Sequence, residues 1–65
     1  MVECYPSVKR LVINMAKNYG EVLQIDKIKN NCEEFSEEEV MKSIKELEGE
    51  GIVTFLGKES IQVII

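Results

Sequence analysis

Apolar residues recur at helical spacing near the start of the chain. The steps between them are three and four residues, so one helix face would carry Val8, Leu11, Val12, Met15 and Tyr19. Pro6 suits the first helical turn, where its missing N–H is not needed, and Gly20 suits a left-handed stop after the last turn. The pattern predicts a helix over residues 6–19.

A short β-prone segment and a second helix follow. Val22 and Leu23 favour a brief strand over residues 21–24. A helix is predicted over residues 25–33, and its apolar side consists of Ile25, Ile28 and Cys32. We therefore expect Cys32 to behave as a small buried hydrophobic residue.

The third predicted helix, residues 37–49, carries the clearest boundary signals. Ser36 and Glu39 have the spacing of a capping box, in which each side chain accepts a hydrogen bond from the backbone N–H of the other residue. Phe35 and Val40 have the spacing of the hydrophobic pair that brackets such a cap. Gly51 supplies a left-handed C-cap. The expected buried stripe consists of Val40, Ile44 and Leu47.

Two runs rich in β-branched and aromatic residues close the chain and predict a β-hairpin over residues 52–65. Between them, Gly57 and Lys58 suit a two-residue type II′ turn, which favours glycine at its first position. The order of elements is then helix, strand, helix, helix, strand, strand. Because 65 residues leave no room for a second core, we expect residues 1–65 to form a single α+β domain.

Several segments resemble the winged helix-turn-helix superfamily. "GEVLQIDKI" is similar to the strand that enters the second helix, "FSEEEVMKSIKELEGEGIV" to the recognition helix and the next strand, and "GKES" to the wing tip. The resemblance extends from Val8 to Ile65 and points to small archaeal and phage regulator domains, without a particular subfamily. It implies a three-helix bundle with a helix-turn-helix, plus a small antiparallel sheet whose hairpin is the wing. Winged helices also occur in protein-binding modules, such as those of the ESCRT membrane-sorting complexes.

Composition excludes other broad classes of protein. Apolar residues make up 45% of the chain and charged residues 31%, as in ordinary globular domains. No apolar run reaches the 18 residues or so that a membrane span requires. The N-terminus lacks the pattern of a signal peptide, so a cytoplasmic protein is expected.

The sequence offers no candidate catalytic or metal-binding residues. The chain contains no histidine, and Cys4 and Cys32 are too far apart for a local C-x-x-C metal site. It also lacks a Gly-rich phosphate loop, and the consecutive glutamates 37–39 fan around a helix, so they cannot form a shared acid–base pair. We therefore expect no enzyme, no cofactor and no metal. A disulfide between the two cysteines stays open, although a cytoplasmic location disfavours it.

Charge divides the chain into two unequal halves. Residues 1–32 carry a net charge of +2, and residues 33–65 a net charge of −6. The superfamily resemblance implies that the first turns of helix 37–49 would enter the DNA major groove, where phosphate contacts require cations. Because this region is rich in glutamate, we expect it to bind a protein, such as a basic partner within transcription, rather than duplex DNA. The expected interaction surface consists of Glu33, Glu34, Glu37, Glu38, Lys42 and Lys45.

Two other sets of residues belong to the alternatives. A DNA-binding transcriptional regulator would use helix 37–49 and the wing, with contacts from Lys27, Lys29, Lys42, Ser43, Lys45 and Lys58. An apolar patch on the hairpin would bind a protein partner or form a homodimer through Val53, Phe55 and Ile64. The N-terminal residues 1–5 could instead fold over that patch. The distribution of charge over helix 37–49 and the wing distinguishes DNA binding from protein binding.

Overall fold

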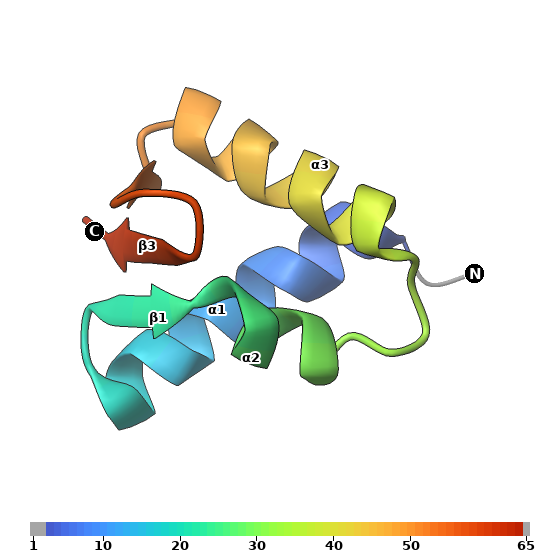
Figure 1. The fold of residues 1–65 in the computed structure, drawn as a ribbon, viewed down its shortest axis with the longest axis horizontal. Coiled ribbons are helices and arrows are strands. Elements are labelled where there is room, and N and C mark those ends of the chain that lie inside the picture. Colours follow the sequence, from blue (N-terminus) through green and yellow to red (C-terminus); the bar gives the residue numbers. More distant parts are fainter. Residues whose placement is uncertain (1–2, 65) are drawn as a thin grey trace.

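Three helices and a three-stranded antiparallel sheet make up residues 3–64, the part of the chain that the computed structural model describes. In chain order the elements are α1 (Cys4–Tyr19), β1 (Val22–Gln24), α2 (Ile25–Asn30), α3 (Glu37–Gly49), β2 (Val53–Phe55) and β3 (Ser60–Val63). The sheet lies at one end of the molecule, and the start of α3 lies at the other (Figure 1). The chain is thus a small α+β domain.

Helix α1 begins at Cys4, two residues before the predicted start. Pro6 is tolerated as its third residue because the first four N–H groups of a helix have no partner within the helix. Val8, Val12 and Met15 are buried as the pattern predicts. Tyr19 is 77% exposed, so its predicted place on the buried stripe is wrong. It is the last residue of α1, where the helix extends beyond the core.

Strand β1 and helix α2 are both shorter than predicted. The helix ends three residues early because Asn31 closes it, and the Asn31 Nδ2 atom donates to the carbonyl oxygen of Lys27 at 2.8 Å. The three apolar residues of this segment, Ile25, Ile28 and Cys32, are nevertheless all buried. The apolar pattern therefore identified the buried side of this segment even though the helix stops before Cys32.

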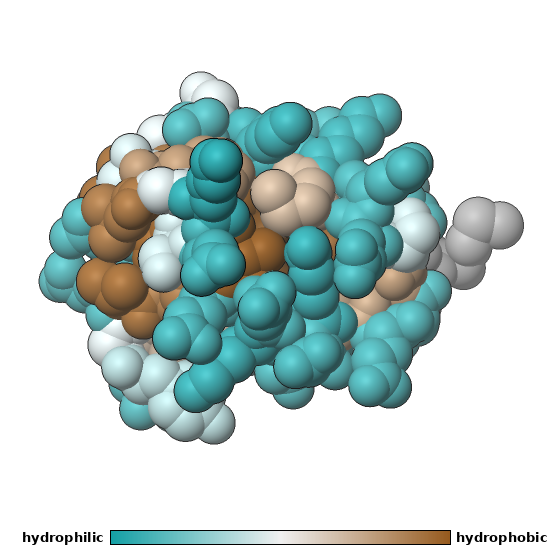
Figure 2. Space-filling view, in the orientation of Figure 1, coloured by the Kyte–Doolittle hydropathy of each residue, from teal (hydrophilic) through white to brown (hydrophobic). Residues whose placement is uncertain are grey.

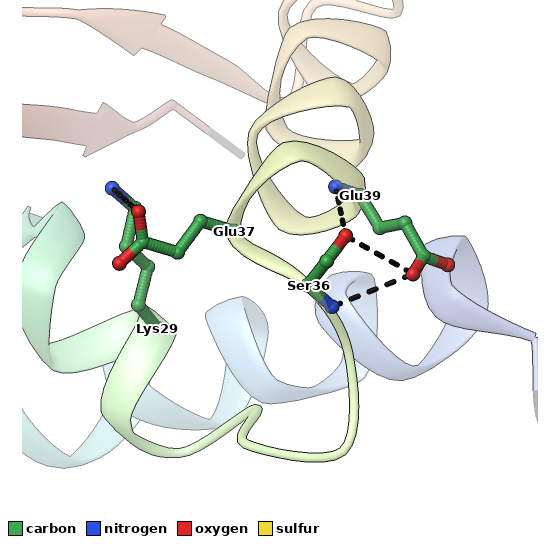
Figure 3. Close-up of polar contacts among 4 residues, drawn as sticks. All are labelled: Lys29, Ser36, Glu37 and Glu39. Atoms are coloured by element: carbon green, nitrogen blue, oxygen red, sulfur yellow. Dashed lines mark hydrogen bonds and ion pairs between the residues drawn. The ribbon is translucent and has the colours of Figure 1, made fainter.

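Helix α3 has the predicted bounds, and its first turn contains the capping box. The N–H of Glu39 donates to the Ser36 hydroxyl at 3.2 Å, and the N–H of Ser36 donates to Glu39 Oε1 at 3.4 Å (Figure 3). The buried apolar residues of the helix are Val40, Ile44 and Leu47.

The C-terminal end of α3 is followed by Gly51, a glycine in the left-handed conformation. Gly51 has a φ of +79°, and its N–H donates to the carbonyl of Glu48 at 3.0 Å. The N–H of Ile52 donates to the carbonyl of Leu47 at 3.0 Å, which completes a Schellman motif. This motif redirects the chain from α3 into the hairpin.

The sheet has the order β1-β3-β2, so β3 is its central strand. Val53 pairs with Val63 and Phe55 with Ile61, and the N–H of Leu56 donates to the carbonyl of Ser60 at 2.9 Å. Residues 57–59 therefore connect the strands, and the predicted two-residue turn is wrong. A two-residue turn would shift the register by one and pair core residues with polar ones. Burial of the core residues overrides the local turn preference.

The core draws on every helix and strand. Its buried apolar side chains are Val8, Val12, Met15, Leu23, Ile25, Ile28, Cys32, Val40, Ile44, Leu47, Val53, Ile61 and Val63. Among residues 3–64, none of the helices is both long enough and apolar enough to cross a membrane.

Candidate functional site

Glutamates dominate the surface around the start of α3. The Ser36 cap places Glu37 and Glu38 in the first turn, where the helix dipole favours negative charge. Glu33 and Glu34 lie in the turn between α2 and α3. All four side chains are exposed, and we call these four residues the acidic surface. Hydrophilic residues cover α2 and the start of α3, whereas hydrophobic residues gather over the sheet (Figure 2).

One lysine of α2 is already engaged with the acidic surface. The Lys29 Nζ atom lies 4.0 Å from Glu37 Oε2 (Figure 3). The Lys29 side chain is only 26% exposed, whereas that of Glu37 is 82% exposed. An ion pair at this distance and exposure contributes little to stability. It nevertheless places a carboxylate beside the lysine and so lowers the positive potential that a phosphate would meet there.

The exposed side of α3 carries two lysines among glutamates. Lys42 and Lys45 lie opposite the buried stripe of the helix, because residues three and four apart share one face. Glu38 and Glu46 are each one turn from Lys42, and Glu48 is three residues from Lys45. Residues 33–50 contain eight glutamates and two lysines. The two lysines therefore do not make this surface cationic.

The remaining candidate lysines face different surroundings. Residues two apart on a helix differ by about 200° around its axis, so Lys27 and Lys29 project from different sides of α2. Lys29 approaches Glu37, whereas Lys27 lines a cavity beside the end of α1. Lys58 is exposed in the loop between β2 and β3 and is followed by the exposed Glu59. The structure separates Lys27 from Lys29 instead of joining them in one stripe.

Ser43 is wrong as a predicted DNA contact. The side chain is buried, with 4% of its surface exposed, and lies on the same side of α3 as the core. Its hydroxyl donates to the carbonyl of Glu39 at 3.0 Å and contacts the sulfur of Cys4 at 3.3 Å. Ser43 therefore joins α3 to the start of α1 and cannot reach a ligand outside the domain.

The predicted apolar patch on the hairpin is not assembled. Val53 is 1% exposed and Phe55 packs against the core, whereas Ile64 is 53% exposed. Residues of a strand alternate between the two faces, so Val53 and Phe55 share the core face with Ile61. Ile64 belongs to the opposite face. The predicted patch is therefore wrong for Val53 and Phe55, because both pack on the inner face of the sheet against the core.

The N-terminal segment does not lie where the alternative interpretation placed it, which was over the apolar patch of the hairpin. Cys4 and Tyr5 form the first turn of α1 and pack against the core, where Cys4 contacts Ser43 of α3. Met1 and Val2 of that segment, and Ile65 of the hairpin, lie outside the described residues. The described part of this segment therefore covers α3 rather than the hairpin.

Cys4 and Cys32 do not form a disulfide, and burial opposes ionisation of the Cys32 thiol. Burial raises the pKa of the Cys32 thiol, and the neighbouring Cys4 and Glu34 raise that pKa further. A raised pKa keeps the thiol neutral, in agreement with a packing role. Among residues 3–64, histidine, cysteine and acidic side chains do not gather into a group that could hold a metal ion.

Comparisons with known proteins do not assign this chain to a family. Neither a family model, nor a curated protein, nor a solved structure matches it. The function is therefore inferred from the surfaces of the domain and their charges.

Proposed function

We propose that this domain is a winged helix whose acidic surface binds a basic segment of another protein. The order of elements supports this assignment, since α2, a turn and α3 are followed by a β-hairpin. In a winged helix, α3 would be the recognition helix and the β2–β3 hairpin the wing. The proposed role requires no catalysis, cofactor or metal.

The observation that carries the proposal is the excess of glutamate on and before α3. Eight glutamates and two lysines occupy residues 33–50, and all four residues of the acidic surface are exposed. A surface of one charge attracts a partner of the opposite charge and accelerates its association. A segment rich in lysine or arginine is the chemistry that fits.

Duplex DNA is a poorer partner for the same surface. Affinity for DNA comes largely from lysine and arginine side chains that displace counterions from phosphates. In this domain Lys29 lies beside Glu37, and Lys27 lines the cavity beside the end of α1. The first turn of α3 would instead bring carboxylates towards the phosphates. This repulsion favours a protein partner over DNA.

Fluorescence anisotropy tests the proposal with two labelled probes at low salt. A generic duplex of about 20 base pairs is expected to bind no more tightly than roughly 10⁻⁴ M, the weak end of non-specific binding. A peptide of alternating lysine and glycine is expected to bind more tightly than the duplex, and its affinity is expected to fall as salt is added. Salt-sensitive micromolar binding to the duplex would instead support a DNA-binding regulator.

A further inference from the structure

A cavity of about 390 Å³ lies beside β1, between the end of α1 and α2. In Figure 1, β3 lies on one side of β1, and the last turns of α1 lie on the other together with α2. The cavity is lined by side chains of all three elements, including Met15, Tyr19, Val22, Gln24, Lys27 and Asn30. Its volume lies in the usual range of ligand sites, about 300–1,000 Å³. We call it the β1 groove.

The backbone of β1 leaves hydrogen-bonding groups free on the side of this groove. The carbonyl of Glu21 accepts from the N–H of Val63 at 2.8 Å, and the N–H of Ile25 donates to the carbonyl of Glu59 at 2.8 Å. Alternate residues of an antiparallel strand pair with the same neighbour. The residues between these paired positions, Val22 and Gln24, therefore direct their backbone groups away from β3.

Three of these outward groups take no part in the hydrogen bonds that join β1 to β3 or that begin α2. They are the N–H and carbonyl of Val22 and the N–H of Gln24, since the carbonyl of Gln24 begins the hydrogen bonds of α2. Strand β1 is an edge strand of the sheet, because the order is β1-β3-β2. A free strand edge is a template for pairing with another extended chain.

The side chains next to this edge are unusually apolar for an exposed site. Tyr19 is 77% exposed and Val22 is 56% exposed, and both line the groove with the buried Met15. Tyr19 and Val22 are two of the four large hydrophobic residues that are exposed within residues 3–64. Burial of these two side chains by a partner would add hydrophobic free energy to the backbone hydrogen bonds.

The charge of the groove indicates which partner it prefers. Lys27 is the one charged residue among those that line it, in a domain whose net charge is −4. The other polar lining residues are amides, such as Gln24 and Asn30. A carboxylate near Lys27 would form a charge-assisted hydrogen bond, whereas a second cation would be repelled.

We propose that the β1 groove binds an extended segment of another protein, which adds to the free edge of β1 as a fourth strand. An apolar side chain of that segment packs against Tyr19 and Val22, and a carboxylate of the segment lies against Lys27. Addition of a strand to an exposed sheet edge is a common mode of peptide recognition. None of these groups belongs to the acidic surface, so the two proposals succeed or fail separately.

A second copy of the chain fits the groove less well than an acidic segment does. Antiparallel pairing of β1 with β1 across a two-fold axis would place the two Lys27 side chains at opposite ends of the interface, each against the groove of the other copy. No acidic residue lines the groove to offset them. The charge therefore favours a different partner.

A titration of the ¹⁵N-labelled protein, followed by NMR, tests the proposal. The probe is a blocked hexapeptide of alternating threonine and valine that ends in aspartate. The peptide is expected to bind saturably, to shift the amide signals of Val22, Leu23 and Gln24, and to slow hydrogen exchange at the Val22 amide. The same peptide with all of its backbone amides methylated should not bind, because neither of its edges can then donate hydrogen bonds.

Two variants distinguish recognition of the peptide carboxylate from non-specific binding of the peptide. A second peptide has asparagine in place of the terminal aspartate and should bind the parent protein more weakly than the aspartate peptide does. Lys27→Gln is expected to lower affinity for the aspartate peptide about two- to fivefold, the range of an exposed ion pair, and to abolish the difference between the two peptides. Lys9→Gln on α1 is the matched control, since Lys9 does not line the groove, and it should leave both affinities unchanged. Shifts confined to β2 or α3 would overturn the proposal. So would shifts at β1 that depend on protein concentration and appear without peptide, since these indicate a second copy.

Discussion

Ser36 sets the start of α3, because its hydroxyl accepts the N–H of Glu39 and its own N–H is held by the Glu39 carboxylate. Replacing Ser36 with alanine removes the acceptor and leaves a backbone N–H without a partner. We expect Ser36→Ala to lower the free energy of unfolding by about 1 kcal/mol, measured by urea denaturation. Lys42→Ala, on the exposed middle of α3, is the control and should change stability by less than about 0.5 kcal/mol.

Cys32 makes the stability of the domain depend on alkaline pH. Burial raises the pKa of its thiol in the folded state, so the unfolded chain loses this proton at a lower pH than the folded chain. The stabilisation is complete below the pKa of the unfolded chain, roughly 8.5, and is lost as pH rises through the folded pKa. We expect the free energy of unfolding to decline above about pH 8.5.

The Cys32→Ala variant isolates this effect from the other groups that titrate at alkaline pH. It should be less stable than the parent at pH 7, because a buried side chain is shortened. Its stability should then decline less between pH 7 and 9.5 than that of the parent. Parallel profiles of the two proteins would contradict a raised pKa at Cys32.

At the scale of elements, two glycines near the end of α3 have opposite roles. Gly49 is the last residue of α3 and is exposed, whereas Gly51 has a φ of +79°, in the left-handed region. In neither case would an added Cβ meet another atom within 4 Å. The backbone conformation alone therefore decides the effect of a substitution.

This difference predicts opposite changes from the same substitution. Gly49→Ala should raise the free energy of unfolding by about 0.5–1 kcal/mol, because alanine favours the helix. Gly51→Ala should lower it by about 1 kcal/mol or more, because a Cβ is strained at positive φ. Thermal denaturation of the two variants measures both effects. Destabilisation by Gly49→Ala would place residue 49 outside the helix.

The hairpin illustrates how elements acquire a register that their own residues do not specify. Gly57 and Lys58 favour a two-residue turn, yet the strands pair so that Val53 meets Val63 and Phe55 meets Ile61. A shift of one residue would move a whole strand to the wrong face. The turn therefore adapts to the core, which forms from residues distant in sequence.

At the scale of the whole molecule, the position of the glutamates matters more than the net charge. A variant that tests this point has glutamine at Glu33, Glu34, Glu37 and Glu38. We expect its affinity for generic duplex at low salt to rise about tenfold, because carboxylates no longer oppose phosphates and Lys29 loses its partner. Its affinity for the lysine-rich peptide should fall. Anisotropy with both probes measures the two changes.

A control variant removes the same amount of charge from other parts of the surface. It carries the corresponding amides at Glu3, Glu21, Asp26 and Glu59. If location decides binding, the control should gain less affinity for duplex than the variant of the acidic surface does. Equal gains would show that only net charge matters, and the acidic surface would then have no specific role.

The sequence by itself determined the elements and the buried side of each helix. The capping box at Ser36, the left-handed Gly51 and the stripe of Val40, Ile44 and Leu47 are local features. They involve residues within about four positions of one another, so hydrogen bonding and periodicity reveal them without a partner. The excess of glutamate around the start of α3 was also evident from sequence alone.

Only the tertiary structure decided which surfaces these elements present. It buried Ser43 and Val53, separated Lys27 from Lys29, and left Tyr19 and Val22 exposed beside a free strand edge. The sequence contains no local signal for the β1 groove, because the order of strands depends on how Leu23, Ile61 and Val63 share one core. Contacts between distant residues set that order, and with it the surfaces that a partner can reach.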